Sequence, residues 1–204
     1  MPNRTNDRPA SGAMRPLLFL HQYVVKPAIV GAVMPSSQAL AREMVSWLEL
    51  HHARAVLEFG PGTGAFTRVI LPRIAKDCRL VLIELNRDFV EVLHRSFPGV
   101  KVYNESVASA RSICDCEGIA MVDCIVSGLP WASFPQALQK SFLAAISSVL
   151  RPGGQFVTFA YRGVDMLPRA RRFRDNLETC FREVTTSRTV AWNLPPACVY
   201  RCRL

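Results

Sequence analysis

The sequence contains no paired cysteine motif. Its seven cysteines include no Cys-x-x-Cys pair, and none of them has a histidine at zinc-finger spacing. The pattern therefore predicts no metal site. It is typical of free, reduced thiols in a cytosolic protein.

The sequence also lacks a long uninterrupted apolar run. A membrane-spanning helix needs roughly 18 consecutive apolar residues. The stretch from Leu17 to Val33 is interrupted by His21, Gln22, Lys26 and Pro27. The pattern excludes a spanning helix here. A secretory signal peptide would carry its charges and cleavage site elsewhere. We expect a soluble or peripheral protein.

Acidic residues are scarce. The 204 residues contain 25 Lys and Arg against 16 Asp and Glu, which gives a formal net charge of +9. Such an excess predicts an anionic partner, which could be nucleic acid, an anionic membrane surface or a phosphate-bearing substrate. The charge alone does not select one of these.

The composition is that of a globular protein. Half of the residues are hydrophobic and one in five is charged, and the length suits one domain with a full core. There are no internal repeats or low-complexity segments. We divide the chain into a disordered N-terminus (1–14), N-terminal helices (15–52) and a core (53–204).

The segment 15–52 is expected to form two helices. Arg15, Gln22 and Lys26 fall on one side of the first helix and apolar residues on the other, so it is basic and amphipathic. It either docks on the domain or lies in a membrane interface. Ser36 or Ser37 would cap the second helix, which runs to about Leu50.

From Ala53 onward, strands alternate with helices. Apolar runs such as "AVLEF", "RLVLIEL" and "GQFVTFAY" are typical of strands buried on both faces. Helical stretches lie at 66–75, 88–97 and 136–150. This alternation predicts an α/β fold with a parallel, doubly wound sheet. The tail predicts two more strands joined by the proline-bearing loop "NLPPA".

Three glycines follow the first of these strands in "VLEFGPGTGAFT". Gly60, Gly62 and Gly64 occupy the first strand-to-helix turn, where ligands bind in such sheets. Their spacing differs from the dinucleotide fingerprint G-x-G-x-x-G, and Glu58 would repel a pyrophosphate. Glu84 ends the next strand and can accept ribose hydroxyls. These features favour S-adenosylmethionine, which carries a sulfonium and an ammonium group but no phosphate.

The motifs "EFGPGTGAFT", "IELN" and "LRPGG" resemble those of class I S-adenosylmethionine-dependent methyltransferases. The flanking motifs "VGAVMPSSQALAREM", "SGLPWASFP" and "WNLPPACVYRCR" resemble bacterial phospholipid N-methyltransferases, relatives of rRNA adenine dimethyltransferases. The resemblance implies a Rossmann-like class I methyltransferase fold: a mostly parallel seven-stranded sheet with an antiparallel C-terminal strand, plus N-terminal amphipathic helices.

The resemblance also assigns cofactor residues. Glu58 and the three glycines would contact the methionine half of S-adenosylmethionine, and Glu84 its ribose. Glu105 lies where the superfamily commonly has an acid near the adenine, although a plain surface acid is an alternative. Ser36 would touch the cofactor's carboxylate or simply cap a helix. Ser127, after the fourth strand, would also line the cofactor site.

The acceptor side departs from the base-methylating relatives. Where they have [Asn/Asp]-x-Pro-[Tyr/Phe], this chain has Ser127, Leu129, Pro130 and Trp131. The departure favours an aliphatic amine over an adenine amine. Ser127 would be an unorthodox gripping group for the amine in the catalytic site, while the backbone carbonyls around Leu129 remain available to it. Trp131 would either offer its π face to a methylated cation or pack in the core.

Other candidates on the acceptor side are three tyrosines, an asparagine and an arginine. Tyr23, Tyr161 and Tyr200 are candidates for accepting a proton or contacting the head group, and Tyr161 is favoured because it closes the fifth strand. Asn193 belongs either to the acceptor wall or to a rigid hairpin turn. Arg169 begins a second basic amphipathic stretch, which would lie on anionic lipid or form a solvated face.

The sequence thus predicts an enzyme that methylates the phosphatidylethanolamine head group stepwise toward phosphatidylcholine. We place it in the cytoplasm, peripheral to the inner face of the cell membrane. Its expected partners are an anionic membrane surface and the phospholipid, with no nucleic acid and no obligate protein partner. The alternatives are an RNA or DNA adenine N6-methyltransferase and a non-catalytic protein that retains the cofactor fold.

Overall fold

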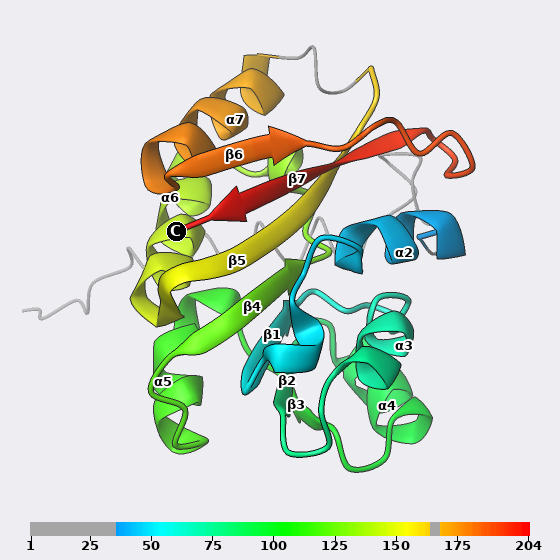
Figure 1. The fold of residues 1–204 in the computed structure, drawn as a ribbon, viewed down its shortest axis with the longest axis vertical. Coiled ribbons are helices and arrows are strands. Elements are labelled where there is room, and N and C mark those ends of the chain that lie inside the picture. Colours follow the sequence, from blue (N-terminus) through cyan, green and yellow to red (C-terminus); the bar gives the residue numbers. More distant parts are fainter. Residues whose placement is uncertain (1–35, 164–167) are drawn as a thin grey trace, which may run out of the picture.

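A seven-stranded sheet forms the centre of the molecule (Figure 1), as seen in a computed structural model that describes residues 36–163 and 168–204. The expected disordered N-terminus, the first amphipathic helix and Tyr23 lie outside the described residues. In chain order, the strands are β1 Ala55–Phe59, β2 Arg79–Ile83, β3 Lys101–Tyr103, β4 Val122–Ser127, β5 Leu150–Tyr161, β6 Glu183–Thr186 and β7 Ala197–Arg203.

The strand order confirms the predicted fold class. The sheet runs β3-β2-β1-β4-β5-β7-β6, and β1 to β5 are mutually parallel. β7 lies antiparallel between β5 and β6. This is the doubly wound arrangement with an antiparallel C-terminal strand. The strand order reverses between β1 and β4, and such a reversal is where α/β sheets open a crevice for ligands.

Helices cover both faces of the sheet (Figure 1). The longer elements are α2 Gln38–Val45, α3 Thr67–Ile70, α4 Arg87–Ser96, α5 Ala110–Cys116, α6 Gln136–Val149 and α7 Pro168–Cys180. Short 3-10 turns lie at Leu50–His52, Leu71–Arg73, Val107–Ser109 and Trp131–Ser133. One core joins the sheet to α5, α6 and α7, and the other joins it to α2, α3 and α4.

Alternation along β1 assigns its side chains to these two cores. Leu57 and Phe59 face the first core, whereas Val56 packs in the second. Both faces of the strand are therefore buried, as the continuous apolar run predicted. Glu58 shares the face of Val56 and is the one charged side chain in this strand.

Two predicted helices are shorter than expected. The stretch 66–75 forms only α3 and a following 3-10 turn, because Pro72 lacks the N–H that would continue an α-helix. α2 ends at Val45, followed by a turn. Ser37 caps its first turn as predicted, with its hydroxyl accepting from Leu40 N at 3.1 Å. α5 was not predicted.

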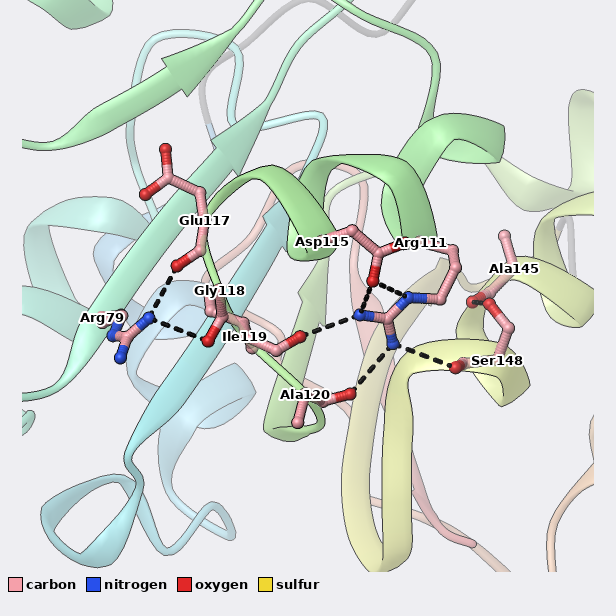
Figure 2. A network of polar contacts seen from close by, with 9 residues as sticks. All are labelled: Arg79, Arg111, Asp115, Glu117, Gly118, Ile119, Ala120, Ala145 and Ser148. Carbon is pink, nitrogen blue, oxygen red and sulfur yellow. Dashed lines mark hydrogen bonds and ion pairs between the residues drawn. The ribbon is translucent and has the colours of Figure 1, made fainter.

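Arg111 closes the amino edge of the sheet (Figure 2). It projects from α5 and donates to the carbonyl oxygens of Ile119 and Ala120 at 2.8 and 2.9 Å, and to Asp115 Oδ1 at 2.7 Å. Arg79 donates to Glu117 O at 2.6 Å beside it. These guanidiniums satisfy carbonyls beyond the helix end that have no partner within the helix.

Among the residues that the structure describes, no helix is long and apolar enough to cross a membrane.

Candidate functional site

The carboxyl edge of the sheet carries the glycine loop after β1. Gly60, Gly62 and Gly64 all have positive φ, at 62°, 55° and 80°. L side chains rarely adopt this conformation, so the loop's path requires glycine. The three differ in their surroundings, and this separates their roles.

Gly62 is the loop glycine whose Cβ position faces open space. A Cβ added there would have no atom within 4 Å, whereas one on Gly64 would overlap the Phe97 ring. A Cβ on Gly60 would lie 2.7 Å from Leu129 Cδ2. Gly64 and Gly60 therefore allow close packing within the protein, and Gly62 leaves bare backbone for a ligand.

Gly128 completes this contact from the neighbouring strand end. A Cβ there would lie 2.6 Å from Gly60 O, and the Gly128 amide donates to Phe59 O at 2.8 Å. The loops after β1 and β4 thus touch, backbone against backbone. Sequence reasoning missed Gly128, although its place directly after a strand was a signal.

Glu58 lies fully buried beneath the loop. Its Oε2 accepts a hydrogen bond from Thr67 Oγ1 at 2.7 Å, and its Oε1 has no hydrogen-bond partner among the described residues. Burial raises the pKa of this carboxyl to about 8, with Glu84 adding to the rise and the Thr67 hydrogen bonds opposing it. An orphaned buried carboxylate oxygen is a place for a cationic or N–H-bearing ligand group.

Glu84 is held against the same loop. Its Oε2 accepts from Gly62 N, and its Oε1 accepts from Asn86 N, both at 2.9 Å. Burial raises its pKa, while these backbone N–H groups work in the opposite direction. The carboxylate is thus oriented at the end of β2, directly beside the open backbone of Gly62.

The end of β3 joins this edge through Asn104. Its Nδ2 donates to Glu84 O at 3.0 Å and to Leu85 O at 2.9 Å. Glu105 follows it, exposed to solvent. The structure therefore brings Glu105 to the expected edge, where both its adenine role and the surface-acid alternative stay open.

Ser127 and Trp131 are bound to each other. The buried Ser127 hydroxyl accepts from Trp131 Nε1 at 3.0 Å and from Leu129 N at 3.4 Å. Trp131 is 1% exposed and stacks on Phe173 of α7 at 4.8 Å. This placement favours the packed-aromatic alternative for Trp131. The Ser127 hydroxyl, expected as an unorthodox gripping group for the amine, is thus bonded to a protein partner.

The carbonyl of Leu129 is also engaged, since it accepts from Trp131 N at 3.0 Å. A carbonyl oxygen has two lone pairs, so this bond leaves the oxygen able to accept from an amine, and the expected gripping of the amine stays a prediction. The Leu129 side chain instead packs over Gly60. Leu129 thus positions the glycine loop.

Tyr161 ends β5 at the same sheet edge, with its ring half-buried against Phe159. Burial raises the pKa of its hydroxyl. The hydroxyl therefore stays protonated at neutral pH, which suits hydrogen-bond donation and disfavours the role of a resident base. Tyr200 lies buried beside Phe173 in the core.

Asn193 joins the β6–β7 loop to α2. Its Oδ1 accepts from Ser37 N at 3.0 Å, and its Nδ2 donates to Pro195 O at 2.7 Å. The buried side chain is therefore a structural tie within the proline loop. This supports the hairpin-turn alternative and brings α2 to the carboxyl edge.

A basic hollow of about 600 Å³ lies between α2 and α3, near the glycine loop. Its lining comprises Ser36, Gln38, Ala41, Arg42, Thr63, Ala65, Arg68, Val69 and Arg73. In the described parts of the chain, none of the three guanidiniums forms an ion pair with a carboxylate. Ser36 thus lies in this hollow, while its neighbour Ser37 caps the helix.

Arg169 lies exposed in the first turn of α7. The apolar stripe of that helix, Ala170, Phe173 and Leu177, is buried in the protein core. This corrects the expectation that the stripe lies on lipid. Only the basic face of α7 is open to solvent.

Comparisons with known proteins agree with this site. A family model described as "Methyltransferase domain" matches residues 56–154. The ornithine lipid N-methyltransferase of Singulisphaera acidiphila is 33% identical over 91% of this chain and 94% of its own length. The chain belongs to the class I S-adenosylmethionine-dependent methyltransferases. Its cofactor is S-adenosylmethionine.

Solved methyltransferases share the fold. The 1,6-didemethyltoxoflavin N1-methyltransferase of Burkholderia thailandensis, with bound S-adenosylhomocysteine, has a TM-score of 0.64 at 17% identity, covering 97% of this chain and 92% of that one. The ribosomal RNA small subunit methyltransferase A of Thermosynechococcus vestitus is 39% identical over only 30% of this chain and 22% of its own length.

The residues of this methyltransferase fit the cofactor. Glu58 offers an unpartnered buried oxygen to the cationic methionine half, and Gly62 offers open backbone beside it. Glu84 is oriented at the strand end where a ribose is bound in such sheets. In the described residues, no cluster of His, Cys, Asp and Glu is arranged to hold a metal ion.

Proposed function

We propose that this methyltransferase N-methylates the primary aliphatic amine of a membrane lipid head group. The observation that carries the proposal is the similarity, over almost the whole length of both chains, to an enzyme named for its action on ornithine lipid. Ethanolamine and the ornithine side chain share a primary amine. Phosphatidylethanolamine, expected from the sequence motifs, and an ornithine lipid are thus the two acceptors to compare.

The chemistry requires a neutral amine. S-adenosylmethionine supplies the methyl group, and the acceptor nitrogen needs a free lone pair, although an alkylammonium has a pKa of about 10.4 in water. Positioning and desolvation contribute most of the rate enhancement in such a transfer. Tyr161 is suited to orienting the head group, because its protonated hydroxyl has no hydrogen-bond partner among the described residues.

The basic hollow supports an anionic lipid as the acceptor. Among the described residues, Arg42, Arg68 and Arg73 form no ion pair with a carboxylate, and guanidiniums bind phosphate and carboxylate groups well. A lipid phosphate or amino-acid carboxylate would find its counter-charge there. The enzyme would then work at the inner face of the cell membrane.

The geometry offers less support for a nucleic acid acceptor. Base-methylating relatives present an Asn or Asp side chain to the amine after the fourth strand. Ser127 stands in that region with its hydroxyl buried and bonded to Trp131. Similarity to ribosomal RNA small subunit methyltransferase A covers only 30% to 35% of this chain.

A methyl-transfer assay with radiolabelled cofactor tests the proposal. Phosphatidylethanolamine, an ornithine lipid and structured RNA are offered in separate tubes, with free ethanolamine as a soluble control. Transfer of the labelled methyl group to either lipid and not to RNA supports the proposal, and the lipid that is methylated faster is the preferred substrate. Label in RNA alone overturns it. Glu58→Gln serves as the variant expected to lose transfer in every tube.

A further inference from the structure

The β6–β7 loop exposes two large apolar side chains. In the described part of the chain, three large apolar side chains are exposed, and two of them are Trp192 at 89% and Leu194 at 73%. The third, Met121 at 41%, precedes β4 at the opposite edge of the sheet. Large apolar side chains that lie this exposed two positions apart indicate an interaction surface.

The loop that carries them is firmly attached. Asn193, between the two, turns inward to Ser37 N and Pro195 O, and its own amide donates to Val190 O. Because the buried amide holds the middle of the loop, Trp192 and Leu194 on either side are directed outward. The exposure is therefore fixed by the fold.

The loop also lies at the site. Ala197, which ends it, pairs with Tyr161, and Pro196 O accepts from Arg162 N at 2.7 Å. Figure 1 shows this connection extending past the sheet on the side of α2. Residues 187–196 contain Arg188 but no acidic residue, so the charge of the loop itself favours an anionic partner.

We infer that Trp192 and Leu194 insert into the interface of a lipid bilayer and hold the carboxyl edge of the sheet against the head groups. Tryptophan prefers this interface, because its ring is apolar while its N–H reaches polar head groups. The inference rests on the proposed function, because an enzyme that methylates lipid head groups needs a surface that contacts the membrane. It adds the surface by which the enzyme meets the membrane.

Tryptophan fluorescence can test this directly. The chain has three tryptophans. Trp131 is buried and Trp47 is covered by the Arg203 guanidinium, so an emission change on binding lipid would report on the exposed Trp192. The probe is a vesicle of equal parts phosphatidylcholine and phosphatidylglycerol, which has no primary amine to methylate. We expect a shift of emission to shorter wavelength and quenching by shallow acyl-chain bromines, both absent in Trp192→Phe.

Binding is measured on the same vesicles by sedimentation. The double variant Trp192→Ser, Leu194→Ser should bind about tenfold or more weakly, since two apolar side chains no longer leave water. The matched control Met121→Ser should bind like the native chain. Equal binding by the double variant, an unmoved Trp192 emission or no binding of the native chain overturns the inference. A concentration-dependent dimer of the native chain that the double variant fails to form also overturns the inference, because a second copy of the chain would then cover Trp192 and Leu194.

The two proposals can fail separately. An amine lipid dispersed in detergent micelles presents the acceptor without a bilayer. If the native chain and the double variant both methylate it, while only the double variant fails on vesicles, both proposals hold. If no lipid is methylated in micelles or vesicles yet Trp192 inserts, the acceptor is wrong and the docking surface stands.

Discussion

The Thr67 hydroxyl donates a hydrogen bond to Oε2 of the Glu58 carboxyl group at 2.7 Å, and Oε1 of that group has no hydrogen-bond partner among the described residues. Burial raises the pKa of this carboxyl to about 8. The unliganded protein therefore holds a proton on Glu58 at neutral pH. A cationic ligand favours the carboxylate form, so cofactor binding and proton release are coupled.

The first prediction is that S-adenosylmethionine binding releases a proton at pH 7 and strengthens as pH rises toward about 8, the pKa of Glu58. Calorimetry in two buffers of different ionisation enthalpy measures the release. In Glu58→Gln the release disappears, and affinity falls by about tenfold or more, which corresponds to about 1.4 kcal/mol. Undiminished release in this variant would assign the proton to another group.

The same group makes the unliganded fold sensitive to pH. Since the folded pKa is raised from 4.5 to about 8, the folded state holds its proton while the unfolded state loses it. Stability should therefore decline as pH rises through that window. Denaturant unfolding at several pH values measures the decline, which should be smaller in Glu58→Gln.

Substitutions at two loop glycines should affect different properties, Gly64 mainly the stability of the fold and Gly62 mainly cofactor binding. Gly64→Ala places a methyl against Phe97, and we expect a loss of about 1–3 kcal/mol in the free energy of unfolding, plus backbone strain. Gly62→Ala meets no atom, so it should cost roughly 1–2 kcal/mol from strain alone while weakening cofactor binding more strongly. Phe97→Leu should partly restore Gly64→Ala. Calorimetry measures the cofactor affinity of each variant, and denaturant unfolding of the same samples measures its stability.

Ser127→Ala should destabilise the fold, because it removes the partner of the buried Trp131 N–H. An unsatisfied buried donor costs about 1–3 kcal/mol. If Ser127 only positions Trp131, the turnover of the folded enzyme should change little, and Trp131→Phe in the same chain should recover part of the stability. A collapse of turnover at unchanged stability would instead make Ser127 a catalytic residue.

Arg111→Ala provides a variant remote from the site. It removes donors to the carbonyls of Ile119 and Ala120 at the amino edge, so unfolding free energy should fall by about 1–2 kcal/mol. Cofactor affinity and acceptor KM should stay unchanged below the melting temperature. A changed KM would mean that the two edges of the sheet communicate.

The sequence predicted the sheet well because its strands are buried on both faces and therefore appear as apolar runs bounded by turns. The two strands of the tail and the glycine loop followed from local signals too, whereas the antiparallel direction of the last strand was implied by the family resemblance. The roles within the loop did not, since Gly64 meets Phe97 across 33 residues and only tertiary packing shows that contact. Trp131 was ambiguous for the same reason: its stacking partner Phe173 lies in α7.

The tie from Asn193 to Ser37 joins positions 156 residues apart in the chain. During synthesis, β1 to β6 are all made before Asn193 and β7 leave the ribosome. Three features are therefore completed together, late in synthesis. They are the tie to the first turn of α2, the insertion of β7 between β5 and β6, and the outward-facing loop. A nascent chain carries the glycine loop early but completes the loop of Trp192 and Leu194 only after the rest of the sheet exists, so whatever surface this loop contacts would meet an already assembled enzyme.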